Sequence, residues 1–102
     1  MGSFLTAREV CQRLRDAALG VLAFNVCERP NAAGMVAVDI DGWSLLLDFA
    51  DGRLHHCEHA RTADGRDGAF DTWQRYGTDP VSLLSTWELA QIEKLLHELT
   101  QP

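Results

Sequence analysis

The chain has 102 residues, of which 46% are hydrophobic and 24% charged, and it carries a formal net charge of −6. A chain of this length and apolar content can bury an ordinary core without disulfides or metals, so we expect a single domain over residues 1–102. Because a net negative surface repels phosphate, the composition argues against nucleic acid and against a membrane surface as partners.

The first predicted element is an amphipathic helix over residues 7–19. Thr6 and Glu9 have the spacing of a capping box, in which the Thr6 hydroxyl accepts a hydrogen bond from the Glu9 N–H. At about 3.6 residues per turn, the apolar side chains form one stripe, made of Ala7, Val10, Cys11, Leu14, Ala17 and Ala18. Gly20 suits the left-handed position that ends a helix. Cys11 lies in the stripe, so we interpret it as a small buried residue rather than a reactive thiol.

A first strand is predicted over residues 21–27, where Leu22, Phe24 and Val26 alternate with smaller or polar residues. A loop is predicted over residues 28–34, which contain proline, asparagine and glycine. Both features precede the clearest pattern in the sequence, a pair of predicted hairpins.

Residues 35–57 predict two β-hairpins in tandem, because Asp-Gly pairs at residues 41–42 and 51–52 separate three apolar runs. A two-residue turn at the first pair brings six alternating side chains together on the core face, namely Val36, Val38, Ile40, Trp43, Leu45 and Leu47. The partly exposed face of this hairpin then carries Met35, Ala37, Asp39, Ser44, Leu46 and Asp48.

The second turn places Leu54 opposite Phe49 on the core face. An unbroken register continues that face to His56 and Glu58 along an edge strand. The other face of the strand then carries His55, Cys57 and His59, near Asp48, Leu46 and Ser44. A bulge of one residue would exchange the two faces, so this assignment depends on an unbroken ladder.

After residue 59 the chain is rich in glycine and aspartate as far as Pro80, which predicts turns rather than a strand. Phe70, Trp73 and Tyr76 recur every three residues within this stretch. The spacing predicts a short helix that lays its aromatic side chains on the core. An aromatic ligand site is the alternative, and we prefer the core interpretation because apolar residues at helical spacing typically mark a buried face.

A second amphipathic helix is predicted from residue 86 through residue 99. Ser85 and Glu88 repeat the spacing of a capping box. The apolar stripe of this helix comprises Leu89, Ile92, Leu95, Leu96 and Leu99. Trp87 falls outside the stripe, so the stripe does not decide whether its side chain is buried or exposed.

Together these elements predict an α+β fold in the order α-β-β-β-β-short α-α, with a four-stranded, mainly antiparallel sheet and two amphipathic helices packed on one face.

The chain resembles a family of short uncharacterised bacterial proteins classed as a domain of unknown function. The resemblance lies in three segments, TAREVCQRLRDAALG, VAVDIDGWSLLL and DPVSLLSTWELAQIEKLL. The resemblance implies a bacterial cytoplasmic protein and no particular activity. An odd count of three cysteines without a signal-peptide pattern also predicts reduced thiols in a cytoplasm.

The predicted cluster with chemical potential is the His/Cys face of the last strand. His55, Cys57, His59 and Asp48 are ligand types for transition metals. In an extended strand, however, the Cβ atoms of His55 and His59 stand roughly 13 Å apart, too far to share one ion easily. Nucleophilic catalysis by Cys57 lacks an identifiable residue to orient its base. We therefore expect neither an enzyme nor a cofactor, and transition-metal binding is the alternative function.

The leading expectation is a small acidic protein-binding or regulatory module, whose partner is another protein or a second copy of the chain. The candidate contact residues are Trp87, which lies outside its helix stripe, and Leu46, which points away from the core face. Tryptophan is enriched at binding hot spots. For Trp87 we favour a second interpretation, in which it folds back on residues 70–76 as a core residue. The stability and the association of a Trp87→Ala variant distinguish the two interpretations.

Overall fold

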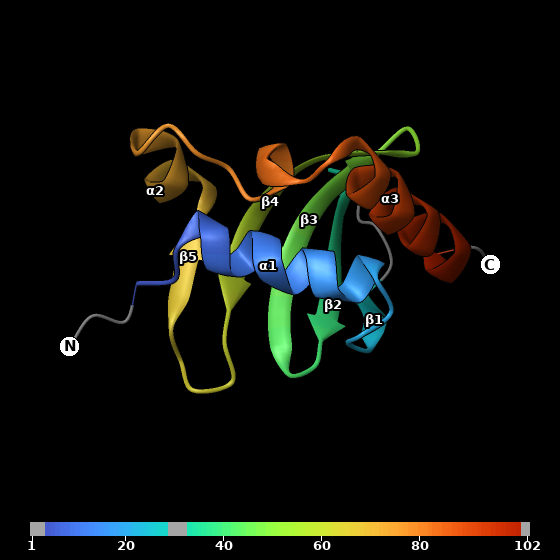
Figure 1. Ribbon diagram of the computed structural model, residues 1–102, viewed down its shortest axis with the longest axis horizontal. Helices are drawn as coiled ribbons and strands as arrows, with labels where there is room; N and C mark the ends of the chain where they lie inside the picture. The colour runs from blue at the N-terminus through green and yellow to red at the C-terminus, as the bar shows by residue number, and fades with distance from the viewer. Residues whose placement is uncertain (1–3, 29–32, 101–102) are drawn as a thin grey trace.

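The computed structural model describes residues 4–28 and 33–100 of the chain. They form an α+β fold in which helices pack on one face of a five-stranded antiparallel sheet (Figure 1). The helices are α1 (Ala7–Ala18), α2 (Phe70–Arg75) and α3 (Thr86–Thr100), with a 3-10 turn η1 (Val81–Leu83) before α3. The strands are β1 (Phe24–Glu28), β2 (Met35–Ile40), β3 (Trp43–Ala50), β4 (Arg53–Arg61) and β5 (Asp67–Ala69). The predicted class is confirmed, but the sheet has five strands rather than the predicted four.

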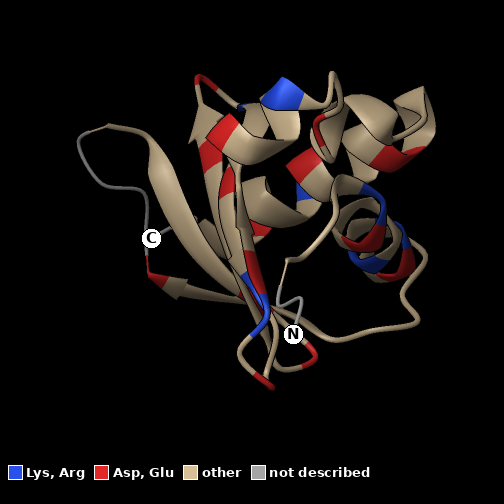
Figure 2. Ribbon diagram, turned by 90° about the vertical axis from the view of Figure 1, so that its left-hand side faces the viewer, with Lys and Arg blue, Asp and Glu red and all other residues tan. Residues whose placement is uncertain are grey.

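β5 is the strand that the sequence does not reveal. It has only three residues, too few for alternation to show, and lies in the stretch predicted to form turns. The strands follow the chain order β1-β2-β3-β4-β5 across the sheet, so β4 is an internal strand rather than the predicted edge strand. Figure 2 shows the helices on one side of the sheet, and in the described part of the chain no helix covers the other side, which we call the open face.

The hairpin of β2 and β3 has the predicted register. Its core positions pair as expected, Val36 with Leu47, Val38 with Leu45 and Ile40 with Trp43. Asp41 and Gly42 have φ angles of 48° and 91°, the left-handed conformations of a tight hairpin turn. Of the six core residues only Trp43 is partly exposed, and the guanidinium of Arg13 stacks on its ring at 4.0 Å from the ring centroid.

The hairpin of β3 and β4 begins as predicted and then departs from the predicted register. Leu54 pairs with Phe49, and both are buried. The ladder then shifts twice, passing over His55 and Glu58. The first shift exchanges the two faces of the strand and the second restores them. The faces predicted for residues 56–57 are therefore wrong.

Both helix starts form as the sequence predicts. In α1 the Thr6 hydroxyl accepts the Glu9 N–H and the Glu9 carboxylate accepts the Thr6 N–H, each at 3.2 Å. All six residues of the predicted α1 stripe are buried. In α3 the Ser85 hydroxyl accepts the Glu88 N–H at 3.2 Å, and the carboxylate of Glu88 accepts the Ser85 N–H at 2.9 Å. Leu99 is 46% exposed, so the last turn of α3 extends past the core and the predicted stripe is too long.

The connection between α1 and the sheet is longer than predicted, because β1 begins at Phe24 rather than at residue 21. The Val21 N–H donates to the carbonyl oxygen of Asp16 at 2.9 Å, so this residue closes the end of α1 instead of starting the strand. Most of the predicted loop over residues 28–34 lies outside the described residues.

One contact at the β5 end of the sheet joins segments far apart in the sequence. The Trp73 indole N–H donates to the Leu5 carbonyl oxygen at 2.9 Å, and the Leu5 N–H donates to the Asp67 carbonyl oxygen at 2.8 Å. Gly68 lies against this contact, since a Cβ there would come within 2.5 Å of the Leu5 carbonyl oxygen. Trp73 is 1% exposed, which confirms its predicted place in the core.

Candidate functional site

The bulges in β4 separate the side chains that the sequence places on one face. Cys57 pairs with Leu47 and is 0% exposed on the core side, whereas His59 pairs with Leu46 on the open face. His55 lies at the first register shift and is exposed. The expectation that His55, Cys57 and His59 share a face is therefore wrong, because it assumed an unbroken ladder.

Cys57 has the properties of a structural cysteine. Burial raises the pKa of its thiol far above the ordinary range, and the thiol donates to the His59 carbonyl oxygen at 3.4 Å. A protonated thiol is a poor nucleophile and a poor metal ligand. Among residues 4–28 and 33–100, no group of three or more His, Cys, Asp or Glu side chains is arranged to hold a metal ion. The proposed ligand set His55, Cys57, His59 and Asp48 is thus not brought together.

The structure instead gathers a group centred on His56 on the open face. Nε2 of His56 lies 2.9 Å from Oε1 of Glu58, and Nδ1 lies 3.5 Å from Oδ2 of Asp48. The imidazole ring centroid is 4.3 Å from that of Phe70. These contacts tie β3, β4 and α2 together. The sequence pattern does not predict the group, because the first bulge is what turns His56 to this face.

Asp79 approaches the bulged part of β4 from the segment before η1. Burial raises the pKa of its carboxyl, although the Val81 N–H, the His56 charge and the Cys57 N–H each oppose the rise. The Val81 N–H donates to Oδ1 of Asp79 at 3.3 Å. Asp79 therefore accepts backbone N–H groups from both β4 and η1, a role that requires no ligand.

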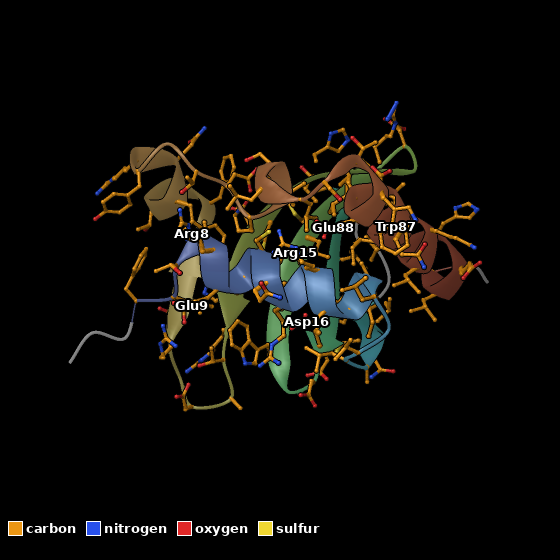
Figure 3. All side chains as sticks on the ribbon, viewed as in Figure 1. Arg8, Glu9, Arg15, Asp16, Trp87 and Glu88 are labelled. Carbon is orange, nitrogen blue, oxygen red and sulfur yellow. The ribbon has the colours of Figure 1, made fainter. Side chains whose placement is uncertain are left out.

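Trp87 projects from the first turn of α3 and is 56% exposed, so the favoured prediction that it folds back as a core residue is wrong. Beside it, the Glu88 carboxylate accepts a hydrogen bond from Nε of Arg15 at 2.9 Å, which links α3 to α1 (Figure 3). The Ser85 N–H lowers the pKa of Glu88 and, although burial opposes this, Arg15 lowers it further. Trp87 therefore stands on a helix start that a cap and an ion pair hold in place.

Leu46 lies on the open face of the sheet, as predicted, and is partly exposed. Its cross-strand row comprises Glu28, Ala37, Leu46, His59 and Ala69. The rows on either side carry charge, with Asp39, Ser44, Arg61 and Asp67 in one and Met35, Asp48 and His56 in the other. Leu46 is thus one apolar residue in a mixed surface, which makes it a weaker contact candidate than Trp87.

A hollow lies where α2 meets the first turn of α1. Its volume is about 370 Å³, and small-molecule sites typically span about 300–1,000 Å³. Phe4, Ala7, Trp73 and Tyr76 supply its apolar lining, and Thr6, Arg8 and Thr78 supply the polar groups. We call this hollow the aromatic groove.

Phe4 and Tyr76 stand together at the aromatic groove, with ring centroids 6.2 Å apart and planes inclined by 54°. Tyr76 is 74% exposed, so the prediction that it packs on the core is wrong. The three-residue spacing of the aromatic residues was the signal available in the sequence. It could not reveal the groove, because Phe4 and Arg8 come from a distant part of the chain.

The fold defines a small α+β domain with a five-stranded meander sheet and helices on one face. Residues 4–98 match the domain of unknown function DUF7693, and the chain therefore belongs to this family. The resemblance to a domain of unknown function that the sequence suggests is thus confirmed. No curated protein and no solved structure matches the chain. In the described residues, no helix combines the length and the apolar character needed to cross a membrane.

Proposed function

We propose that this chain is a protein-binding module that pairs with a second copy of itself and acts by binding rather than by catalysis. The observation that carries the proposal is that Trp87 is 56% exposed. Three further exposed apolar residues lie on or just beyond α1 and α3, namely Leu19, Val21 and Leu99. We call these four residues the α1–α3 surface. A contiguous exposed apolar patch is typical of an association surface, whereas single exposed apolar residues are common on any protein, so the proposal rests chiefly on Trp87.

The elements that carry the α1–α3 surface lie side by side. α1 and α3 contact each other, and Figure 1 shows the end of α1 beside α3 at one end of the sheet. The Ser85 cap and the ion pair between Arg15 and Glu88 hold the start of α3, so a rigid backbone presents Trp87. A large aromatic side chain with few rotatable bonds loses little entropy on binding, which suits it to a hot spot.

The charges of the two helices favour a second copy as the partner. α1 carries three arginines against Glu9 and Asp16, whereas α3 carries three glutamates against Lys94. Arg13 and Arg15 already have partners within the fold, so the argument rests on net charge, which is +1 for α1 (three arginines less two acids) and −2 for α3 (one lysine less three glutamates). A two-fold arrangement that places α1 of one copy on α3 of the other therefore brings helices of opposite net charge together. Repulsion between two copies of net charge −6 acts over a longer range, and physiological salt screens it beyond about 8 Å.

Sedimentation equilibrium of the wild type and of Trp87→Ala tests this proposal. We expect the wild type to dimerise and Trp87→Ala to weaken the dimer by about 30-fold, equivalent to the loss of about 2 kcal/mol at a hot spot. The denaturant midpoint should be nearly unchanged, because the side chain is exposed. Tyr76→Ala is the matched control, since it removes an exposed aromatic ring at the other end of the molecule and should leave association unaltered.

Two outcomes contradict the proposal. One is a wild-type chain that remains monomeric at millimolar concentration. The other is a Trp87→Ala variant that loses stability while its association is unaltered, because the side chain would then serve the fold rather than an interface.

A further inference from the structure

We infer that the aromatic groove binds a small organic carboxylate with an aromatic or similarly flat apolar body. The groove lies at the α2 end of the molecule, and the α1–α3 surface lies at the α3 end (Figure 1). The two sites are therefore separate, and each can be tested without the other.

The anion is inferred from Arg8. The other two arginines of α1 have partners, because Arg15 bonds Glu88 and Arg13 lies against Trp43 and Asp41. Arg8 has no carboxylate partner among residues 4–28 and 33–100, and it lines the groove. Figure 3 shows it at the end of α1 that lies next to α2. A guanidinium in this position is free to pair with a carboxylate through two parallel hydrogen bonds.

The acidic neighbour of Arg8 does not compete for it. Glu9 accepts a hydrogen bond from Arg66 at 2.7 Å and closes the α1 cap with Thr6. Burial opposes ionisation of Glu9, but the hydrogen bonds from Arg66 and Thr6 outweigh it and lower the pKa of this carboxyl. The charge of Glu9 is thus matched within the fold, and the positive charge of Arg8 is the one left facing the groove.

The apolar body is inferred from the aromatic lining. Phe4 and Tyr76 stand 6.2 Å apart, centroid to centroid, and Trp73 is fixed by its hydrogen bond to the Leu5 carbonyl oxygen. Trp73 is already held in place and therefore needs little reordering when a ligand binds. Flat apolar groups gain most from such surroundings, since aromatic rings favour tilted or offset contacts with one another.

The size of the groove favours a free small molecule over a peptide segment. A volume of about 370 Å³ is near the lower end of the range for small-molecule sites. The Thr6 hydroxyl is already engaged with the Glu9 carboxylate at 3.0 Å. The Thr78 hydroxyl has no hydrogen-bond partner in the described parts of the chain, so it offers a second polar contact beside Arg8.

A matched pair of probes tests the inference by NMR titration of the full chain. The probes are 4-phenylbutyrate and its uncharged amide, 4-phenylbutyramide, and the readouts are the Trp73 indole N–H and the Thr78 backbone N–H. We expect saturable shifts of both signals with the acid and affinity about tenfold lower for the amide, since one charge-assisted contact is worth roughly a factor of ten or more. Arg8→Gln should remove that difference between acid and amide.

Arg53→Gln is the control variant, because it neutralises an exposed arginine that does not line the groove. It should leave the preference for the acid intact. Equal binding of acid and amide, or failure of both to shift the two signals in the wild type, would overturn the inference. So would tighter binding of a blocked Ala-Phe-Asp-Ala peptide than of the small acid, because the occupant would then be a protein segment.

Discussion

The two Asp-Gly hairpins of this sheet share the same kind of turn and differ in their register farther along the strands. Asp51 and Gly52 have φ angles of 55° and 74°, close to those of Asp41 and Gly42 in the first turn. The ladder of β2 and β3 then runs without a shift, whereas the ladder of β3 and β4 shifts twice within six residues of the turn. An Asp-Gly turn therefore sets the pairs next to it, such as Phe49 with Leu54, but does not control the register farther along the strands.

The difference lies in what each hairpin must contact. Both hairpins have a further strand on the outer side, β1 beside β2 and β5 beside β4. β4 also meets Asp79 and η1, so its backbone N–H groups have a partner outside the sheet. The bulge at His55 leaves the Cys57 N–H available to the Asp79 carboxylate and turns the Cys57 side chain into the core. Bulges that redirect side chains in this way are selected features of a sheet rather than defects.

Cys57→Asp should give the largest effect, because it tests the reversal of faces directly. The bulged ladder buries this position completely, so an aspartate there should destabilise the fold by about 4 kcal/mol or more. Leu46→Asp, on the open face of the neighbouring strand, is the control and should cost only about 1 kcal/mol. Equal losses in urea denaturation would mean that Cys57 is exposed and that the first bulge is absent.

Gly68→Ala should give the next largest effect. This variant tests whether the second Asp-Gly hairpin can lose stability while the first keeps it. Its Cβ would meet the Leu5 carbonyl oxygen at 2.5 Å and Cζ2 of Trp73 at 2.9 Å, which should cost about 3 kcal/mol. Hydrogen exchange should then increase in β4 and β5 while β2 stays protected. Ala69→Gly, a neighbouring change that causes no clash, should cost about 1 kcal/mol or less. Uniform loss of protection across the sheet would show that β5 does not stabilise the second hairpin separately.

Gly42→Ala and Gly52→Ala test whether the turns themselves differ. Both glycines have left-handed φ angles with no close neighbour, so each substitution should cost about 1 kcal/mol. Asp51→Asn is a suitable control, because asparagine tolerates the left-handed conformation and should change the urea midpoint very little. If one glycine proved far more costly than the other, the turns could no longer be treated as equivalent and the bulges would not be the main difference.

The smallest expected effect is a pH dependence at Asp79. Burial raises the pKa of this carboxyl in the fold, so the fold favours its protonated form. The resulting contribution to the free energy of unfolding is fully present below the ordinary pKa of about 4, and it is lost as the pH rises through the higher folded pKa. Asp79→Asn keeps an oxygen acceptor for the Val81 N–H but does not ionise. The stability of the variant relative to the wild type should therefore rise between acid and neutral pH.

Asp64→Asn should show the opposite sign, because the Thr62 hydroxyl lowers the pKa of Asp64 despite a small opposing burial effect. In that case the wild-type advantage is present at neutral pH and is lost as the pH falls through the lowered value. Thermal denaturation of both variants across the acid range measures the two slopes. Slopes of the same sign would rule out this account of Asp79.

Local rules predicted the parts of the fold that depend on neighbouring residues. The sequence predicted both helix starts, because a capping box is complete within four residues. The two boxes are Thr6 with Glu9 and Ser85 with Glu88. β5 and the bulges were not predictable in this way, since each depends on partners brought together only by the tertiary fold. The candidate sites divide similarly. The position of Trp87 outside its helix stripe was visible in the sequence, whereas the aromatic groove joins segments that no local pattern connects.

The contacts of Leu5 bear on the order in which the molecule assembles. Its hydrogen-bond partners, Asp67 and Trp73, belong to the other half of the chain, so the segment that carries Phe4 can dock only after β5 and α2 have formed. Contacts between such distant segments close a long loop, and their entropic cost places them late on a folding route. We therefore expect the aromatic groove to be among the last features completed during folding, which hydrogen exchange during refolding would measure. Whatever occupies it also strengthens the attachment of this late segment, because a ligand that binds only the docked form shifts the local equilibrium toward docking.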